Sequence, residues 1–342
     1  MKKILLLFII PMLLGCEKDD DIEDVIDYGA RRSEITQMID TDGLNHSNFP
    51  FIDCSTSTSP LRDLVTYNIL DIPYEWFRNV VTGSYYYIAW KVPDGIVMGS
   101  DEHKLLADDL LNLRKSNGSH GAYVNLIDGN TDLIIDSRNI SRNEIDYSNE
   151  KEVSIQTKPL AWDAMVFLVH PSNKVKSLTI EQIQGIYTGE ITNWKQLGGS
   201  DMEIHPYMRD ADSGSQEKME TMVMKGKKML EWPEMVGYDM ISPYTQIEFD
   251  PKGIGYSPYF FCKAMVRDLY GVRVLAIDGV EASKESILKS VDGQSGGYPF
   301  YSQIYAAIRA DEPVISIPHQ IYDWFESASA RSIISESGYI PL

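Results

Sequence analysis

The most constraining feature of this sequence is a recurring unit: an apolar segment, a corner of small or hydroxyl residues, and a helical pattern. Residues 49–53 form one such segment, and Ser59 and Pro60 behind it suit the cap and first turn of a helix. Further apolar segments of strand length are residues 131–135, 162–170 and 204–208. Strands that alternate with helices predict an α/β protein with mostly parallel sheets.

Helical periodicity continues elsewhere in the chain. After Ser215, apolar residues as far as Leu230 fit one helix face, and we interpret the methionines among them as core packing rather than metal ligands. Other expected elements are helices at residues 31–39, 180–189 and 320–335, and strands at residues 253–256, 272–277 and 314–317.

Size and charge narrow the class of protein. The chain has 342 residues, 43% of them hydrophobic, which is enough for one large or two medium cores. Its formal net charge is −19 and no extended basic stretch occurs, so nucleic acid is not an expected partner.

The first sixteen residues predict export. Lys2 and Lys3 precede a short apolar run at residues 4–14, too short to span a membrane on its own. The run ends in Leu-Leu-Gly-Cys, which resembles a bacterial lipobox and implies lipidation of Cys16. The alternative is an ordinary signal peptide with a chance cysteine.

An acidic run at residues 17–21 follows the cysteine. It is typical of a solvated tether, which we place at residues 16–30 after a signal peptide at residues 1–15. It also resembles the export signal of Bacteroidetes surface lipoproteins, so the expected location is the periplasmic side of a membrane or the outer cell surface.

The other cysteines and the histidines give no metal site. Cys54 and Cys262 lie in apolar segments 208 residues apart, so we expect two buried free thiols, with a disulfide as the alternative in an exported protein. The six histidines lack ligand spacing, so neither a metal nor a cofactor is expected.

The stretch RDADSGSQ has the composition of an anion-binding loop. A helix N-terminus offers unpaired N–H groups and a partial positive charge, glycine allows close approach, and a guanidinium matches an oxyanion. The residues that supply these groups are Arg209, Ser213, Gly214 and Ser215, with similar corners at Ser57, Thr58 and Ser119. Each corner alone could be a simple cap, and Arg209 alone a surface ion pair; the prediction depends on their convergence.

The chain resembles the phosphate-binding, type II periplasmic solute-binding proteins of phosphate ABC transporters. The motifs that carry the resemblance are AMVFLVHPSNKVKSLTIEQIQGIYTGEITNWKQLGG, RDADSGSQ, VLAIDGVEASKESILKS, GGYPFYSQIY, CSTSTSPL and SHGAYV. Together they cover most of residues 50–310. The resemblance implies a phosphate site made by the residues just named, two α/β lobes with mixed sheets, and two crossover strands.

One position departs from the family pattern. Many members place an acidic hydrogen-bond acceptor where this chain has Ser137, between Asp136 and Arg138. We include Ser137 among the ligand residues, with Asp136 and Arg138 as possible ones. Selectivity for phosphate depends on whether Asp136 reaches the site, because an unpaired buried acceptor rejects sulfate. Arg138 either adds a second cation or pairs with Asp136.

The expected lobes are residues 31–160 with 263–342, and residues 161–262. Residues 66–117 are longer than in the family and predict either a lobe extension or a partner surface. The expected protein is a monomeric, lipid-anchored phosphate receptor that serves an ABC permease and has no catalytic residues. One alternative is a surface binding or sensing lipoprotein with another ligand. Another is a serine hydrolase, for which His120 is the only histidine near a serine corner.

Overall fold

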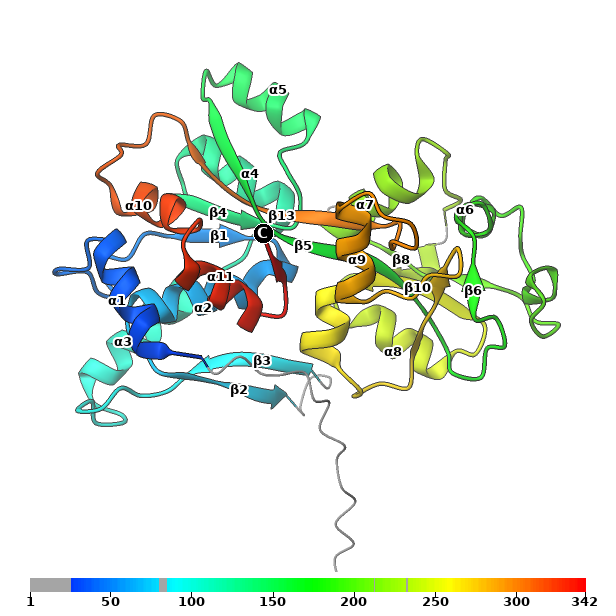
Figure 1. Cartoon of the computed structure of the whole chain (residues 1–342), viewed down its shortest axis with the longest axis horizontal. Helices are drawn as coiled ribbons and strands as arrows, with labels where there is room; N and C mark the ends of the chain where they lie inside the picture. Colours follow the sequence, from blue (N-terminus) through cyan, green and yellow to red (C-terminus); the bar gives the residue numbers. More distant parts are fainter. Residues whose placement is uncertain (1–25, 80–84, 212, 232) are drawn as a thin grey trace, which may run out of the picture.

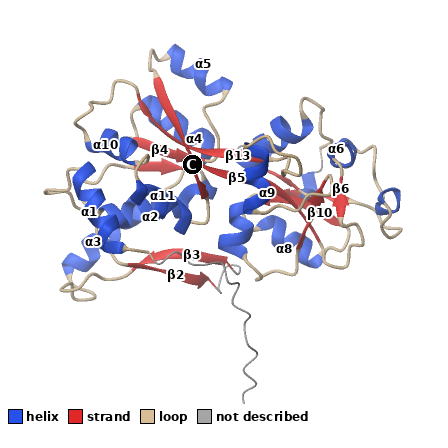
Figure 2. Cartoon of the chain, in the orientation of Figure 1, coloured by secondary structure: helices blue, strands red, loops and turns tan. Residues whose placement is uncertain are grey.

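The structure is a computed structural model that describes residues 26–79, 85–211, 213–231 and 233–342. Two α/β lobes lie side by side, joined at the centre of the molecule by β5 (Ile155–Val169) and β13 (Tyr301–Arg309) (Figure 1). Helices cover the strands of both lobes (Figure 2). The expectation of two lobes joined by two crossover strands is confirmed.

The first lobe is built on strands β1, β4, β13 and the first part of β5. β1 (Ile52–Cys54) and β4 (Leu133–Asp136) are parallel, whereas β13 is antiparallel to both of its neighbours. β14 (Ile340–Pro341) pairs with β5 as well. The helices of this lobe are α1 (Tyr28–Met38), η1 (Thr56–Thr58), α2 (Ser59–Ile69), α3 (Asp101–Leu113), α4 (Gly118–Asp128), α5 (Arg142–Glu150), α10 (Ile317–Trp324) and α11 (Ala328–Glu336).

The second lobe is built on the end of β5, which pairs with β10 (Gly253–Pro258) and β11 (Arg273–Val274). β7 (His205–Pro206) extends this sheet parallel to β10. The remaining strands are β6 (Ser177–Leu178), β8 (Met208–Arg209), β9 (Val236–Gly237) and β12 (Ala276–Ile277). The helices are α6 (Ile180–Thr188), η2 (Trp194–Leu197), α7 (Gly214–Lys218), η3 (Met219–Met224), η4 (Pro233–Met235), α8 (Ser242–Phe249), η5 (Phe261–Val266) and α9 (Lys284–Val291).

The chain returns to the first lobe later than residue 263, where the sequence placed the boundary. β11 pairs with the end of β5 at Val169, and β12 pairs with β6. Leu275 and Ile277 are fully buried there. These contacts keep residues 273–277 in the second lobe, so the return runs along β13 instead.

Three local predictions were wrong. Residues 314–317 are not a strand, since Val314 and Ile315 are exposed and α10 begins at Ile317. The single helix expected over residues 320–335 is two helices, because the Ser327 side chain accepts a hydrogen bond from the Ala330 amide and starts α11. The helical segment after Ser215 ends at Met224, where Lys225 takes a positive φ, so the face does not continue to Leu230.

The additional segment of residues 66–117 packs as an extension of the first lobe. It contains α3 and the antiparallel pair β2 (Tyr74–Asn79) and β3 (Tyr85–Trp90). Ile88, Leu106 and Leu110 are buried in the main core. The Arg267 guanidinium, which follows η5 in the second lobe, lies 4.1 Å from the ring centroid of Tyr86 on β3. The β2–β3 strand pair therefore also contacts the second lobe.

Cys54 and Cys262 are both buried and free, as expected. Within the described ranges, no cluster of three or more metal-ligating side chains occurs. No helix in the same ranges has the length and hydropathy needed to cross a membrane. The segment that carries Lys2, Lys3 and Cys16 lies outside the described residues.

Candidate anion-binding cavity

A cavity of about 330 Å³ lies between the two lobes, and its wall is rich in hydroxyl and backbone groups. It is lined by Ser55, Thr56, Ser57, Ser116, Asn117, Gly118, Ser119, Ser137, Arg209, Asp210, Ser213, Gly214, Ser215, Tyr238 and Met240. The structure therefore brings together seven of the eight residues that the sequence singled out as ligand residues.

The eighth residue, Thr58, faces away from this cavity. Its hydroxyl donates to the carbonyl of Ile135 at 2.6 Å and lies 2.8 Å from the Ser55 hydroxyl. Thr58 therefore fixes η1 against β4. Ser55, two positions before Ser57, lines the cavity instead.

Asp53 ties the first corner to the second. Its carboxylate accepts hydrogen bonds from the Cys54 amide, from the amide and side chain of Asn117, and from the side chain of Asn125, all at 2.7–3.0 Å. Gly118 follows with φ +72°, a conformation that favours glycine, and opens α4 beside the cavity. The α4 N-terminus thus lies at the cavity wall with Ser119.

Asp136 ends β4 directly before Ser137 but does not line the cavity. Its side chain is fully buried, and its Oδ2 atom has no hydrogen-bond partner among the described residues. The buried Ser119 hydroxyl interacts with the Asp136 carboxyl and acts to lower its pKa. Burial raises the pKa of Asp136 to about 7, against the opposing effect of nearby Arg138.

Arg209 is held by its inner atoms, and its charge is left largely uncompensated. Its backbone amide donates to the Tyr256 hydroxyl, and its Nε donates to the Gly237 carbonyl at 3.1 Å. One terminal nitrogen contacts the Met240 sulfur, and the other lies 3.7 Å from Asp210. Burial lowers the pKa of Arg209, as expected where the cation lacks a close counter-charge.

The start of α7 closes the cavity from the second lobe. The Ser213 side chain accepts a hydrogen bond from the Ser215 amide, and η3 continues the helical segment to Met224. A Cβ atom built on Gly214 would lie 2.8 Å from the Ser119 hydroxyl and 2.9 Å from the Ser137 hydroxyl. Gly214 therefore permits a contact between the lobes that a larger residue would block.

Arg138 is neither a second ligand cation nor a side-chain partner of Asp136. Its guanidinium binds both oxygens of the buried Glu144, at 2.6 and 2.8 Å, and forms an ion pair with Glu217 of α7. Only its backbone amide donates to Asp136, at 3.2 Å. The carboxylates of Glu144 and Glu217 compensate the positive charge of Arg138, which the sequence analysis included as a possible ligand group.

Sequence reasoning missed several cavity residues. Thr56, Asn117 and Gly118 adjoin the predicted corners, so a wider reading of each corner would have found them. Tyr238 and Met240 come from the segment after β9, which has no corner motif, and only the fold reveals them. His120 lies outside the cavity wall and contacts Glu144 at 3.1 Å, so it does not face a serine nucleophile there.

Residues 110–316, more than half of the chain, match the PBP superfamily domain. The chain belongs to this family. Among curated PBP relatives, it is 26% identical over 216 residues to the phosphate-binding protein PstS of Borreliella burgdorferi, spanning 61% of this chain and 71% of that one. It is 27% identical over 203 residues to PstS of Bacillus subtilis, spanning 57% and 62%.

Solved structures support the PBP fold. A putative phosphate ABC transporter substrate-binding protein with bound phosphate from Clostridium perfringens aligns with TM-score 0.59 and 21% identity, over 85% of this chain and 98% of that chain. An ABC-type phosphate transport receptor from Vibrio cholerae aligns with TM-score 0.57 and 21% identity, over 84% and 98%. The type II binding-protein fold expected from the sequence is confirmed.

Proposed function

We propose that this chain is an exported receptor that binds inorganic phosphate, or a similar tetrahedral oxyanion, between its lobes and delivers it to an ABC permease. The observation that carries the proposal is the cavity in which Arg209 and the hydroxyls of four corners converge from both lobes. The relatives named for phosphate binding support the choice of anion.

The donors are sufficient for useful affinity. Hydrogen bonds to a charged group contribute about 1.5–3 kcal/mol each, and a micromolar dissociation constant needs about 8 kcal/mol. Four or five such bonds contribute about 6–15 kcal/mol in total, a range that includes this value. The overall charge of −19 does not oppose binding strongly, since charges more than about 8–10 Å away are screened at physiological salt.

Asp136 is the group that we propose for recognising the proton of hydrogen phosphate. Ser137 occupies the position where an acceptor carboxylate was expected and lines the cavity, whereas the adjacent Asp136 is fully buried and does not line it. The Ser119 hydroxyl, which interacts with Asp136, connects the two in this proposal by accepting from the ligand and donating to Asp136. Sulfate has no proton at neutral pH and would leave such an acceptor unpaired.

Isothermal titration of the purified chain with phosphate, sulfate and methylphosphonate tests the proposal. We expect phosphate to bind with micromolar affinity or better, sulfate to bind at least about 10-fold more weakly, and Arg209→Ala to lose about 30- to 150-fold in affinity. If none of the three anions binds, the alternative of a surface binding or sensing lipoprotein with another ligand gains support.

We further propose that the protein is a monomer outside the cytoplasm and is anchored to a membrane by lipid on Cys16. This proposal rests on the lipobox-like residues and the basic and apolar segment before them. Metabolic labelling with a palmitate analogue would detect the anchor in the full chain. Cys16→Ser should abolish the label, whereas Cys54→Ser, which alters a buried thiol, should retain it.

A further inference from the structure

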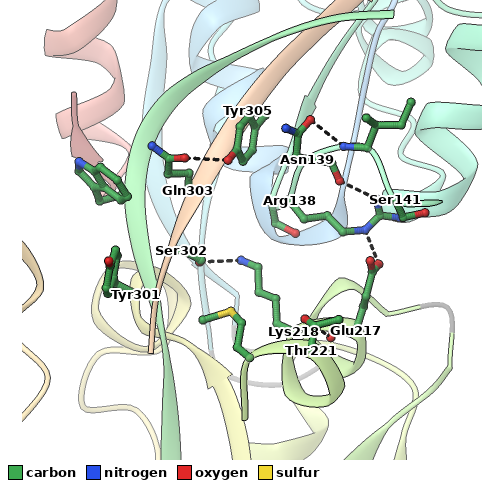
Figure 3. A pocket seen from close by; sticks show the side chains of 14 residues that line it. Arg138, Asn139, Ser141, Glu217, Lys218, Thr221, Tyr301, Ser302, Gln303 and Tyr305 are labelled. Carbon is green, nitrogen blue, oxygen red and sulfur yellow. Dashed lines mark hydrogen bonds and ion pairs between the residues drawn. The ribbon is translucent and has the colours of Figure 1, made fainter. Parts of the chain in front are cut away.

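Helix α7 contacts the first lobe a second time, beyond the residues that line the anion cavity. The Glu217 carboxylate forms an ion pair with Arg138, and Lys218 donates to the Ser302 hydroxyl at 3.0 Å. Figure 3 shows the two side chains extending from α7 toward the loop after β4 and toward β13. They line a separate cavity of about 340 Å³ and do not line the anion cavity.

Glu217 contacts an arginine that the first lobe already holds in place. Arg138 is held by two hydrogen bonds to Glu144, which is itself fully buried and accepts a further bond from the Ser141 amide. Arg138 therefore belongs to the first lobe whether or not Glu217 is near. The ion pair therefore joins Glu217 of α7 to a guanidinium that the first lobe holds in place.

The second contact buries an ammonium group against the crossover strands β13 and β5. Lys218 is 7% exposed, and the buried carboxylates of Asp136 and Asp163 act on its charge, together with the opposing cation Arg138. Asp163 lies on β5 opposite Ser302, within the part of β5 that pairs with β13. Burial lowers the pKa of the Lys218 ammonium, and the Asp163 and Asp136 carboxylates oppose that effect.

We propose that Glu217 and Lys218 are positioning residues that hold the lobes together and so raise affinity for an anion that they do not touch. The inference rests on the proposed function. An interaction made only in the closed form increases its population, and the apparent affinity rises with the population of the binding-competent form. The two residues have opposite charges, so the contact leaves the net charge beside the cavity unchanged.

Glu217→Gln and Lys218→Met in the full chain test the proposal. Each has a matched control that removes the same charge from an exposed site of the second lobe, Glu190→Gln and Lys227→Met respectively. Phosphate affinity is measured by titration calorimetry, and the radius of gyration by X-ray scattering without phosphate and at saturation.

We expect Glu217→Gln to weaken phosphate binding about 3- to 5-fold and Lys218→Met about 10-fold, with the controls within about 2-fold of the parent chain. At saturating phosphate both variants should recover the parent radius of gyration. Unchanged affinity in both variants would overturn the inference. So would a weaker variant that stays expanded at saturation, because that result indicates damage to α7.

Failure of the proposed function gives a different result. If the parent chain binds no phosphate, sulfate or methylphosphonate, the interlobe contact is tested by the radius of gyration without phosphate alone. A larger radius in both variants than in their controls would support the interlobe contact, and equal radii would overturn it.

Discussion

Two arginines at the junction of the lobes have opposite surroundings. Arg138 binds Glu144 and Glu217, whereas Arg209 has a carbonyl, a thioether and an aspartate at 3.7 Å. The cavities beside them are similar in volume and share Ser137. The difference shows that a guanidinium is available to a ligand only where the fold withholds its carboxylate partners.

The largest expected effect comes from removing the compensated arginine. Arg138→Met leaves the fully buried Glu144 without its cation, and breaking a buried pair in this way costs about 3–5 kcal/mol. Urea denaturation at pH 7 without phosphate measures it. Arg209→Met should lose less than about 1 kcal/mol in the same assay, and equal losses would contradict the comparison.

A pH titration tests the buried acid Asp136, which lies beside Arg138. The folded pKa of Asp136 is raised from 3.8 to about 7, so its contribution to stability is full below about pH 4 and is lost as pH rises through 7. The shift corresponds to at most about 4 kcal/mol. Asp136→Asn should therefore remove about 2–4 kcal/mol of the decrease in unfolding free energy between pH 4 and pH 8.

Denaturation in phosphate-free buffer at both pH values measures this change. Asp163 on β5 is a second buried acid with a raised pKa, and it does not line the cavity. Asp163→Asn is therefore the comparison variant. A pH dependence of stability that is the same in the parent chain and in Asp136→Asn would show that Asp136 does not titrate in this range.

Gly214→Ala sharpens the comparison at the contact between the lobes. Its Cβ would lie within 3 Å of the Ser119 and Ser137 hydroxyls, and overpacking of this kind costs about 1–3 kcal/mol. Phosphate affinity should fall about 5- to 150-fold, with the melting temperature in phosphate-free buffer unchanged. Gly271→Ala, at an exposed glycine of the second lobe where an added Cβ would meet no atom closer than 4.0 Å, gives a control for the substitution itself. Retained affinity in Gly214→Ala would argue against closure at this point.

The smallest expected effect is at the cavity mouth. Tyr238 is 80% exposed although it lines the cavity, so its hydroxyl stays largely hydrated and adds little to binding. Tyr238→Phe should change phosphate affinity less than about 3-fold by calorimetry. A larger loss would move Tyr238 into the group of principal ligand residues.

Much of the fold was predictable from local patterns. The capping box at Thr179 and Gln182, and Gly189 with φ +79°, set the ends of α6 as expected. The apolar run at residues 162–170 likewise predicted a strand, which forms the second half of β5. Errors arose where a local signal was contradicted by burial, as at the exposed Val314 and Ile315.

The sequence by itself determined the alternation of strands and helices and the supply of donors at their junctions, because both depend on spacing along the chain. Tertiary structure decided which donors face the ligand cavity: Ser55 rather than Thr58, and Arg209 rather than Arg138. Each choice depends on a partner on another element, which is Ile135 of β4 for Thr58, and Glu144 of α5 with Glu217 of α7 for Arg138. A side chain that binds such a partner is no longer available to an anion, and that competition is settled only when the elements pack against one another.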